Sequence, residues 1–158
     1  MIAQNSSKDL EGLLVVTVEQ AVAAPYTSCR LADAGARVIK IERPEGDFAR
    51  NYDSNALGNS AYFVWLNRGK ESIALDLKNK EDMEVFENII SKSDILIQNL
   101  APGAFERLGL DLKELRLKYP SLITCSISGF GDEGPYKNQK AYDMLIPVSY
   151  THLRAHET

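Results

Sequence analysis

The chain has 158 residues, of which 44% are hydrophobic and 25% charged, and its formal net charge is −4. This length suits one domain with a real core, and the composition is ordinary for a globular protein. An acidic chain argues against a nucleic-acid partner, because proteins that bind a duplex present a basic footprint.

Several features predict a cytoplasmic protein without membrane contact. No apolar run approaches the ~20 residues that span a bilayer. Residues 1–9 form a polar leader, MIAQNSSKD, without the apolar core of a signal peptide. Cys29 and Cys125 make no disulfide framework, so reduced thiols are the simpler interpretation.

The first clear unit lies at residues 13–47. Its opening apolar run, residues 13–18, predicts a strand that is covered on both faces. Pro25 suits the first turn of a following helix, and Gly35 suits the cap at its end. Val38 to Ile41 then predict a second strand, so the unit is β-α-β.

The rest of the chain continues this alternation. Residues 44–58 predict a loop, and the aromatic stretch 59–66 predicts either a short helix packed in the core, which we favour, or the lining of a cleft. Alternating strands and helices imply a parallel sheet in an α/β fold. Strands are expected at residues 72–77, 94–98 and 122–128, and helices at 79–91, 105–107 and 112–119.

A ligand site is expected where the strands end. In open parallel sheets, ligands lie outside the carboxyl ends of the strands, and Glu42 and Arg43 occupy one such end. A guanidinium there suits a phosphorylated ribose, as in NADP or coenzyme A. The first loop, Val22-Ala23-Ala24-Pro25, lacks the G-x-G-x-x-G fingerprint, which weakens the nicotinamide interpretation.

Successive motifs now carry a resemblance. LEGLLVV, AAPYTSCRLADAGARVIKIERPEGD, NRGKESIALDLK, QNLAPGAFERLGL, ISGFGDEGPY and KAYD resemble, in order, those of the class III CoA-transferases, the formyl-CoA, L-carnitine and bile-acid-inducible type. The resemblance implies an incomplete Rossmann-like CoA-binding domain at residues 10–146, with a parallel sheet flanked by helices. Residues 147–158, PVSYTHLRAHET, depart from the family pattern and are expected to be a non-native tail.

Coenzyme A carries a 3′-phosphate and a pyrophosphate, so its site needs converging cations or N–H donors. The turn 99–103 precedes a helix and is expected to offer free N–H groups. The opposing interpretation is that Lys78 and Arg107 are solvated surface charges, as most lysines and arginines are. By resemblance, the expected CoA contacts are Val22, Ala23, Arg43, Leu75, Lys78, Asn99, Leu100, Ala104, Arg107, Leu108 and Lys140.

The resemblance also implies the chemistry. An aspartate attacks the acyl-CoA, forms a mixed anhydride and later returns the acyl group to a thioester. In the family this aspartate follows a glycine downstream of KAYD, beyond the end of this chain, and Asp143 matches only a flanking acidic position. We therefore expect a fragment that is inactive alone, from an enzyme that forms interlocked homodimers and uses acyl-CoA and a carboxylic acid as substrates.

Two alternatives stay open, an α-methylacyl-CoA racemase or epimerase and a non-catalytic NADP-type module. Tyr142 is expected to line the active site, where the racemases carry a histidine; tyrosine is a poor base at neutral pH, which favours the transferase.

Val22 stands where formyl-CoA transferases carry a glutamine, which argues against a formyl or oxalyl substrate. His152 and His156 could share one helical face, but no further ligand is near in sequence, so no metal is expected.

Overall fold

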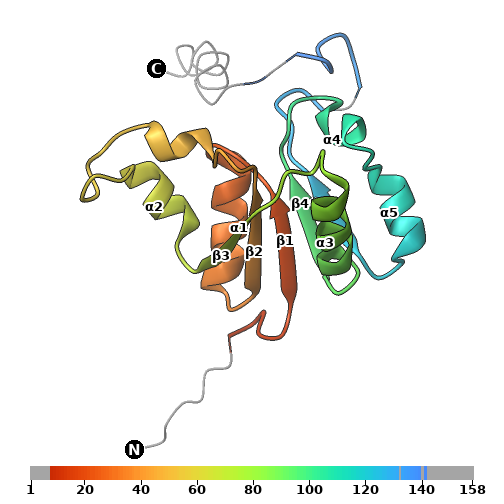
Figure 1. Cartoon of the computed structure of the whole chain (residues 1–158), viewed down its shortest axis with the longest axis horizontal. Coiled ribbons are helices and arrows are strands. Elements are labelled where there is room, and N and C mark those ends of the chain that lie inside the picture. Colours follow the sequence, from red (N-terminus) through yellow and green to blue (C-terminus); the bar gives the residue numbers. More distant parts are fainter. Residues whose placement is uncertain (1–7, 132, 140, 142–158) are drawn as a thin grey trace, which may run out of the picture.

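The computed structural model describes residues 8–131, 133–139 and 141. In this part of the chain, five parallel strands form one sheet in the order β3-β2-β1-β4-β5 (Figure 1). Their register is regular, with Val16 of β1 opposite Ile39 of β2 and Leu96 of β4. The strands are β1 (Leu14–Val18), β2 (Arg37–Glu42), β3 (Lys70–Ala74), β4 (Ile95–Gln98) and β5 (Ile123–Ser126).

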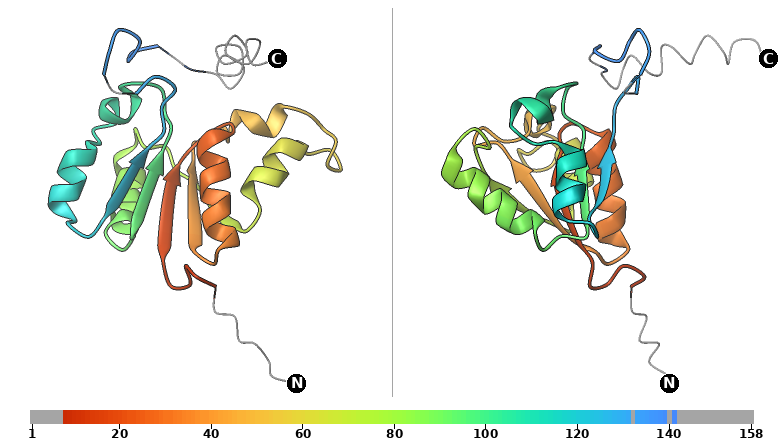
Figure 2. Two further views of the ribbon diagram at one scale, coloured as in Figure 1. Left: turned by 180° about the vertical axis from the view of Figure 1, so that it is seen from behind. Right: turned by 90° about the vertical axis from the view of Figure 1, so that its right-hand side faces the viewer.

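Helices cover both faces of this sheet, which confirms the predicted α/β, Rossmann-like fold. One face carries α1 and α2, and the other carries α3, α4 and α5 (Figure 2). A short 3₁₀ helix, η1 (Phe48–Asn51), lies in the loop between β2 and α2. The helices are α1 (Ala23–Asp33), α2 (Ala61–Asn67), α3 (Lys80–Ile90), α4 (Ala104–Arg107) and α5 (Leu112–Lys118).

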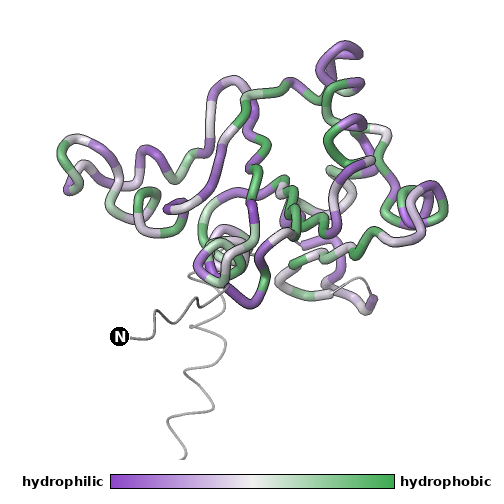
Figure 3. The backbone as a smooth tube through the Cα atoms, turned by 90° about the horizontal axis from the view of Figure 1, so that it is seen from below, coloured by the Kyte–Doolittle hydropathy of each residue, from purple (hydrophilic) through white to green (hydrophobic). Residues whose placement is uncertain are grey.

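The two faces of the sheet are buried in different ways. On the α3 side, Val16 and Val18 of β1 pack with Phe86 and Ile90 of α3 in a continuous apolar cluster. Hydrophobic segments gather in the central strands, and hydrophilic ones dominate the outer loops (Figure 3). On the α1 side, the apolar cluster around Val15 is smaller. Beside it lies a group that we call the ionic layer: Glu19, Lys40, Glu42, Asp47 and Lys70, all with buried side chains.

Two strands differ in their bounds from the predicted ones. β3 lies at Lys70–Ala74 rather than 72–77, because its pairing partner β2 ends at Glu42, opposite Ala74. Leu75 and Leu77 are nevertheless buried against the α3 side. β5 is likewise shorter than predicted.

The favoured core packing of the stretch 59–66 is wrong for two of its aromatic residues. Ser60 caps α2 by accepting the N–H of Phe63, and only Leu66 of this seven-residue helix is fully buried. Tyr62 and Trp65 are about half exposed. None of the helices in the described part of the chain is long and apolar enough to cross a membrane.

Candidate functional site

The loops that follow β1, β2, β3 and β4 meet at one edge of the sheet, because all the strands are parallel. The strand order changes direction at β1, which lies between β2 and β4; such a switch point is where open α/β sheets bind ligands. Two adjacent pockets lie there, a smaller one of about 190 Å³ and a larger one of about 730 Å³.

The smaller pocket is lined by the ends of β1 and β2 and by the loop after β3. Arg43 donates from Nε to the carbonyl of Gly46 at 3.0 Å, and its terminal nitrogens have no further partner among the described residues. Lys78 is exposed, and its ammonium has no partner in this part of the chain either. The pocket therefore offers two cations to an anionic ligand. Five predicted contacts line it: Arg43, Leu75, Lys78, Leu100 and Leu108.

The larger pocket contains four predicted contacts, Val22, Ala23, Asn99 and Leu100. Most of its wall was missed by the sequence analysis. The alternative interpretation of the stretch 59–66, that it lines a cleft, holds for Tyr62. The other lining residues, drawn from three separate segments, include Phe48, Tyr52, Pro102, Ile127, Phe130 and Lys137.

A turn at Gln20 and Ala21 separates the pockets, and Gln20 and Leu100 line both of them. Asn99 holds this turn through its side chain: Oδ1 accepts the N–H of Gln20 and Nδ2 donates to the carbonyl of Gln20, each at 2.9 Å. On the other side, the N–H of Ala21 donates to Oδ1 of Asp47 at 3.2 Å. The amide of Asn99 is thus engaged by the backbone, although the residue lies at the pocket wall.

Other predicted contacts are not brought to the pockets. Ala104 and Arg107 line neither, and Arg107 donates from Nη1 to the carbonyl of Pro102 at 3.4 Å. Lys140, Tyr142, Asp143, His152 and His156 lie outside the described residues.

The expectation of free N–H groups in the turn 99–103 is wrong for two of its residues. The N–H of Asn99 donates to Val18, and that of Leu100 to the side chain of Gln98. The N–H of Ala104, at the start of α4, is taken by Ala101. The physical reasons are that the chain still pairs with the end of β1 at Asn99, that the side chain of Gln98 accepts from Leu100, and that the short helix satisfies its own first N–H.

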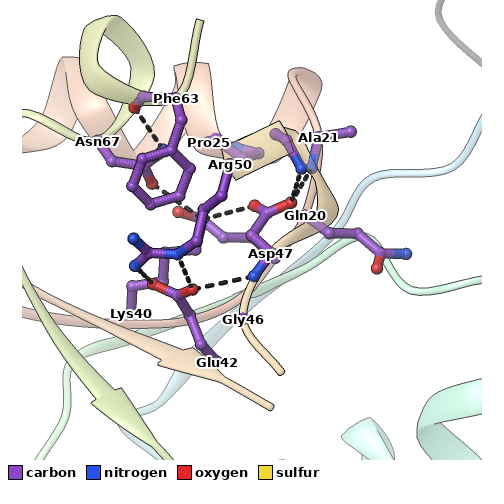
Figure 4. Close-up of polar contacts among 12 residues, drawn as sticks. Gln20, Ala21, Pro25, Lys40, Glu42, Gly46, Asp47, Arg50, Phe63 and Asn67 are labelled. Atoms are coloured by element: carbon purple, nitrogen blue, oxygen red, sulfur yellow. Dashed lines mark hydrogen bonds and ion pairs between the residues drawn. The ribbon is translucent and has the colours of Figure 1, made fainter. Parts of the chain in front are cut away.

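The ionic layer was not anticipated from the sequence; three of its residues, Lys40, Glu42 and Asp47, lie beside the turn (Figure 4). Lys40 donates from Nζ to Oδ2 of Asp47 at 2.7 Å and to Oδ1 of Asn67 at 2.9 Å. Lys40 and Arg50 also lie near the ring of Phe63, at 5.0 and 4.0 Å from its centroid. The visible signal was the pair of charged residues at alternate positions of β2, Lys40 and Glu42, which face the same side of the sheet.

Glu42 is buried and held by Arg50 through two hydrogen bonds of 2.8 and 3.0 Å. Ser72 and the N–H of Asp47 also donate to its carboxylate. Burial alone would raise the pKa of Glu42, but these donors outweigh it and lower the pKa to about 2. The carboxylate of Glu42 is therefore occupied by partners within the protein, although the residue lines the smaller pocket.

A second buried pair ties α1 to the sheet. Lys70 donates to Glu19 at 2.7 Å and to the carbonyl of Pro25 at 2.8 Å, and Ser28 donates to the same carboxylate. Burial lowers the pKa of Lys70, and the charge of Glu19 offsets part of this effect. Within the described residues, no group of three or more His, Cys, Asp or Glu side chains could hold a metal ion.

The fold is a parallel α/β sheet with its candidate site at the switch point, and comparison with known proteins gives the family. The chain belongs to CoA-transferase family III, whose family model matches residues 10–154. It is 42% identical over 137 residues to an acetyl-CoA:oxalate CoA-transferase of Acetobacter aceti. It is 36% identical to a succinate–glutarate CoA-transferase of Agrobacterium fabrum and 37% identical to a succinyl-CoA:mesaconate CoA-transferase of Haloarcula hispanica.

These matches cover 86% to 90% of this chain but only 35% to 38% of each relative, so the chain spans little more than a third of their length. Solved structures show the same fold over a similar share of a longer chain. A CaiB/BaiF family protein from Brucella suis superposes with a TM-score of 0.83 at 38% identity, covering 90% of this chain and 39% of that one. A hypothetical protein from Mycobacterium tuberculosis gives a TM-score of 0.84 at 31% identity, covering 90% and 40%.

Proposed function

We propose that this chain is the CoA-binding part of an enzyme that moves CoA between an acyl-CoA and a free carboxylic acid. One observation carries the proposal: a pocket that presents the cations of Arg43 and Lys78 and a larger, mostly apolar pocket meet at Gln20 and Leu100. Coenzyme A has a phosphorylated nucleotide at one end and an acylated thiol at the other. The smaller pocket, with Arg43 and Lys78, suits the nucleotide phosphates, and the larger one suits the arm that carries the acyl group.

The proposed contacts with CoA remain those expected from the resemblance: Val22, Ala23, Arg43, Leu75, Lys78, Asn99, Leu100, Ala104, Arg107, Leu108 and Lys140, with Tyr142 lining the active site. Support is strongest for the residues that line the two pockets. The side chain of Asn99 acts through the backbone of Gln20, so its proposed role is to shape the wall.

In the proposed reaction, an aspartate carboxylate attacks the thioester carbonyl, the carbon–sulfur bond breaks and CoA leaves as the thiolate. The aspartate then carries the acyl group as a mixed anhydride. The incoming carboxylate attacks the aspartyl carbonyl of this anhydride, which releases the first acid and forms a second anhydride with the new acyl group. The thiolate attacks the new acyl carbonyl, which forms the product thioester and frees the aspartate carboxylate. The family motif with the nucleophile is not found in these 158 residues. We therefore propose that this chain binds CoA but does not transfer it.

We further propose that the acceptor is a dicarboxylic acid. The three relatives described above are named for oxalate, glutarate and mesaconate, each of which carries two carboxylates. Lys137 lines the larger pocket and supplies a cation on its wall for a second carboxylate. This proposal includes oxalate, whereas Val22 argued against an oxalyl substrate. Titrating oxalate, glutarate and butyrate into the CoA-loaded chain tests both the preference for dicarboxylic acids and the exclusion of oxalate. Amide shifts at Lys137 with the two diacids but not with butyrate would support it.

The assembled enzyme is proposed to be a homodimer in the cytoplasm. An exposed run of rings, which we call the aromatic strip, joins Tyr26, Trp65, Tyr62, Tyr52 and Phe48 through centroid distances of 5.8 to 6.3 Å. A contiguous apolar surface of this kind is typical of an interface. Both cysteines are free thiols, as in a reducing compartment.

Calorimetric titration of this chain with CoA and with NADP tests the central proposal, together with a transfer assay. We expect CoA to bind, NADP to bind at least tenfold more weakly, and no transfer to occur. Tight NADP binding without CoA binding would replace the transferase with a nucleotide-binding module. Exchange of the α-proton of an acyl-CoA in deuterated water would point to a racemase instead.

A further inference from the structure

The turn between β1 and α1 adopts a conformation that its sequence does not favour. Ala21 has φ of 63°, in the left-handed region. A side chain at Cβ makes this conformation unfavourable, and glycine is the residue that usually adopts it. Some other interaction must therefore hold Ala21 in place. Within the described residues, the N–H of Ala21 has one polar contact, with Oδ1 of Asp47.

Asp47 is built into the protein as a fixed acceptor. Its side chain is 1% exposed. Oδ1 accepts from Ala49 at 2.9 Å as well as from Ala21, and Oδ2 accepts from Lys40 at 2.7 Å (Figure 4). The ammonium of Lys40 is equally buried and is itself anchored to Asn67. The carboxylate therefore cannot rotate without breaking several contacts at once.

We propose that Asp47 is a positioning residue for the CoA site, because it holds the Ala21 turn in its left-handed conformation and so fixes the wall between the two pockets. This proposal rests on the function proposed above. Asp47 shares the task with Asn99, which grips Gln20 from the β4 side. The turn is thereby held from both flanks of β1, next to Val22 and Ala23 on the wall of the larger pocket.

Electrostatic repulsion and positioning predict opposite changes in CoA affinity when the charge of Asp47 is removed. Asp47 also lines the smaller pocket, beside Arg43. A carboxylate there repels an anionic ligand, and removing it would leave Lys40 without its counter-charge. If charge were all that mattered, neutralising Asp47 would tighten CoA binding. Positioning predicts the opposite.

The experiment compares Asp47→Asn and Asp47→Ala with a matched control, Asp53→Asn. Asp53 also accepts two backbone N–H groups, from Asn55 and Ala61, in the same connection between β2 and α2, but it lines neither pocket. For each variant that melts cooperatively, the CoA dissociation constant is measured by calorimetry, and exchange of the Ala21 amide is followed by NMR. We expect Asp47→Asn to weaken CoA binding on the order of tenfold, with faster Ala21 exchange, and Asp53→Asn to change neither.

A second substitution separates positioning from general loss of stability. Glycine adopts a positive φ readily, so Ala21→Gly lowers the cost of the left-handed turn. In the Asp47→Ala background it should restore part of the lost CoA affinity, over and above any change that the same substitution causes in the wild type, a coupling that a double-mutant cycle measures. A purely structural role of Asp47 predicts no such rescue.

The outcomes separate this proposal from the proposed function. Unchanged or tighter CoA binding by a folded Asp47→Asn variant would overturn the positioning role. If the wild type does not bind CoA, the proposed function fails. Amide exchange alone then tests whether Asp47 holds the Ala21 turn. Faster Ala21 exchange in Asp47→Asn, but not in Asp53→Asn, would still support it, and equal exchange would overturn it.

Discussion

Asn99 uses its whole side-chain amide on one residue: it accepts the N–H of Gln20 and donates to the carbonyl of Gln20, both at 2.9 Å. These residues are 79 positions apart in the sequence. The contact joins the end of β4 to the end of β1 across the switch point. It explains why an asparagine, with one donor and one acceptor group, suits a position between two pockets.

We predict that Asn99→Ala destabilises the protein by about 1 to 2 kcal/mol, because two partly buried backbone groups lose their partners. CoA affinity should fall as well, since the wall between the pockets loses one of its two supports. Urea denaturation and calorimetry measure the two effects. Asn88→Ala, on the exposed face of α3, is the control and should change each by less than 0.5 kcal/mol. Equal effects of the two variants would contradict the role of Asn99.

Arg43 is predicted to bind the 3′-phosphate of CoA, since its terminal nitrogens face no partner within the described chain. Arg43→Gln should weaken CoA binding by about five- to tenfold, the equivalent of ~1 to 1.4 kcal/mol for a partly exposed charged hydrogen bond. Dephospho-CoA should bind the variant and the wild type equally well. Lys92→Gln, the same charge change at an exposed site after α3, controls for net charge. A uniform loss for both ligands would assign Arg43 to another group of the cofactor.

Lys70→Met should destabilise the fold by about 3 to 5 kcal/mol, because it leaves Glu19 buried without its cation. The matched control is Glu71→Gln, which breaks the exposed pair with Arg37 from the next position of β3. That change should cost at most about 1 kcal/mol. Chemical denaturation of both variants gives the comparison. Similar losses would mean that burial adds nothing to the inner pair.

The acid limb of the stability profile should depend on Glu42. Its pKa in the folded protein is about 2, below the ordinary value of 4.5, so the unfolded chain binds the extra proton first as the pH falls. The contribution of Glu42, on the order of 2 to 3 kcal/mol, is present above about pH 4.5 and is lost as the pH drops toward 2. Glu42→Gln should therefore lower the stability at pH 7 and flatten its fall between pH 4.5 and 2. The free energy of unfolding is measured by urea denaturation at several pH values. An equally steep fall of this free energy with pH in Glu42→Gln and in the wild type would contradict the assignment.

Much of the fold could be predicted because hydrophobic periodicity depends on local sequence. The alternation of apolar runs located all five strands of the described sheet and the long helix α3. Boundaries were less certain: the end of β3 is set by its partner β2, which no local pattern reveals.

The candidate site was harder to predict, because its walls come from distant segments. Arg43 and Lys78 follow strands, where parallel sheets bind ligands, and both line the smaller pocket; their contact with CoA stays a prediction. Phe48 and Tyr52 lie in a loop that composition describes only as polar turns, and Asp47 gives no signal until Lys40 and Ala21 are placed beside it. Buried charges are invisible to hydropathy, which treats each of them as surface.

The ionic layer has a consequence for how this domain can change. Well-packed apolar contacts tolerate exchanges of similar volume, so the α3 side of the sheet can drift through many sequences without moving its helices. Paired charges allow few such exchanges, because each partner dictates the other. The two sides of the sheet should therefore differ in how many substitutions they tolerate. The α1 side, whose ionic layer supports the pocket wall, is the side that evolution or a designer can alter least.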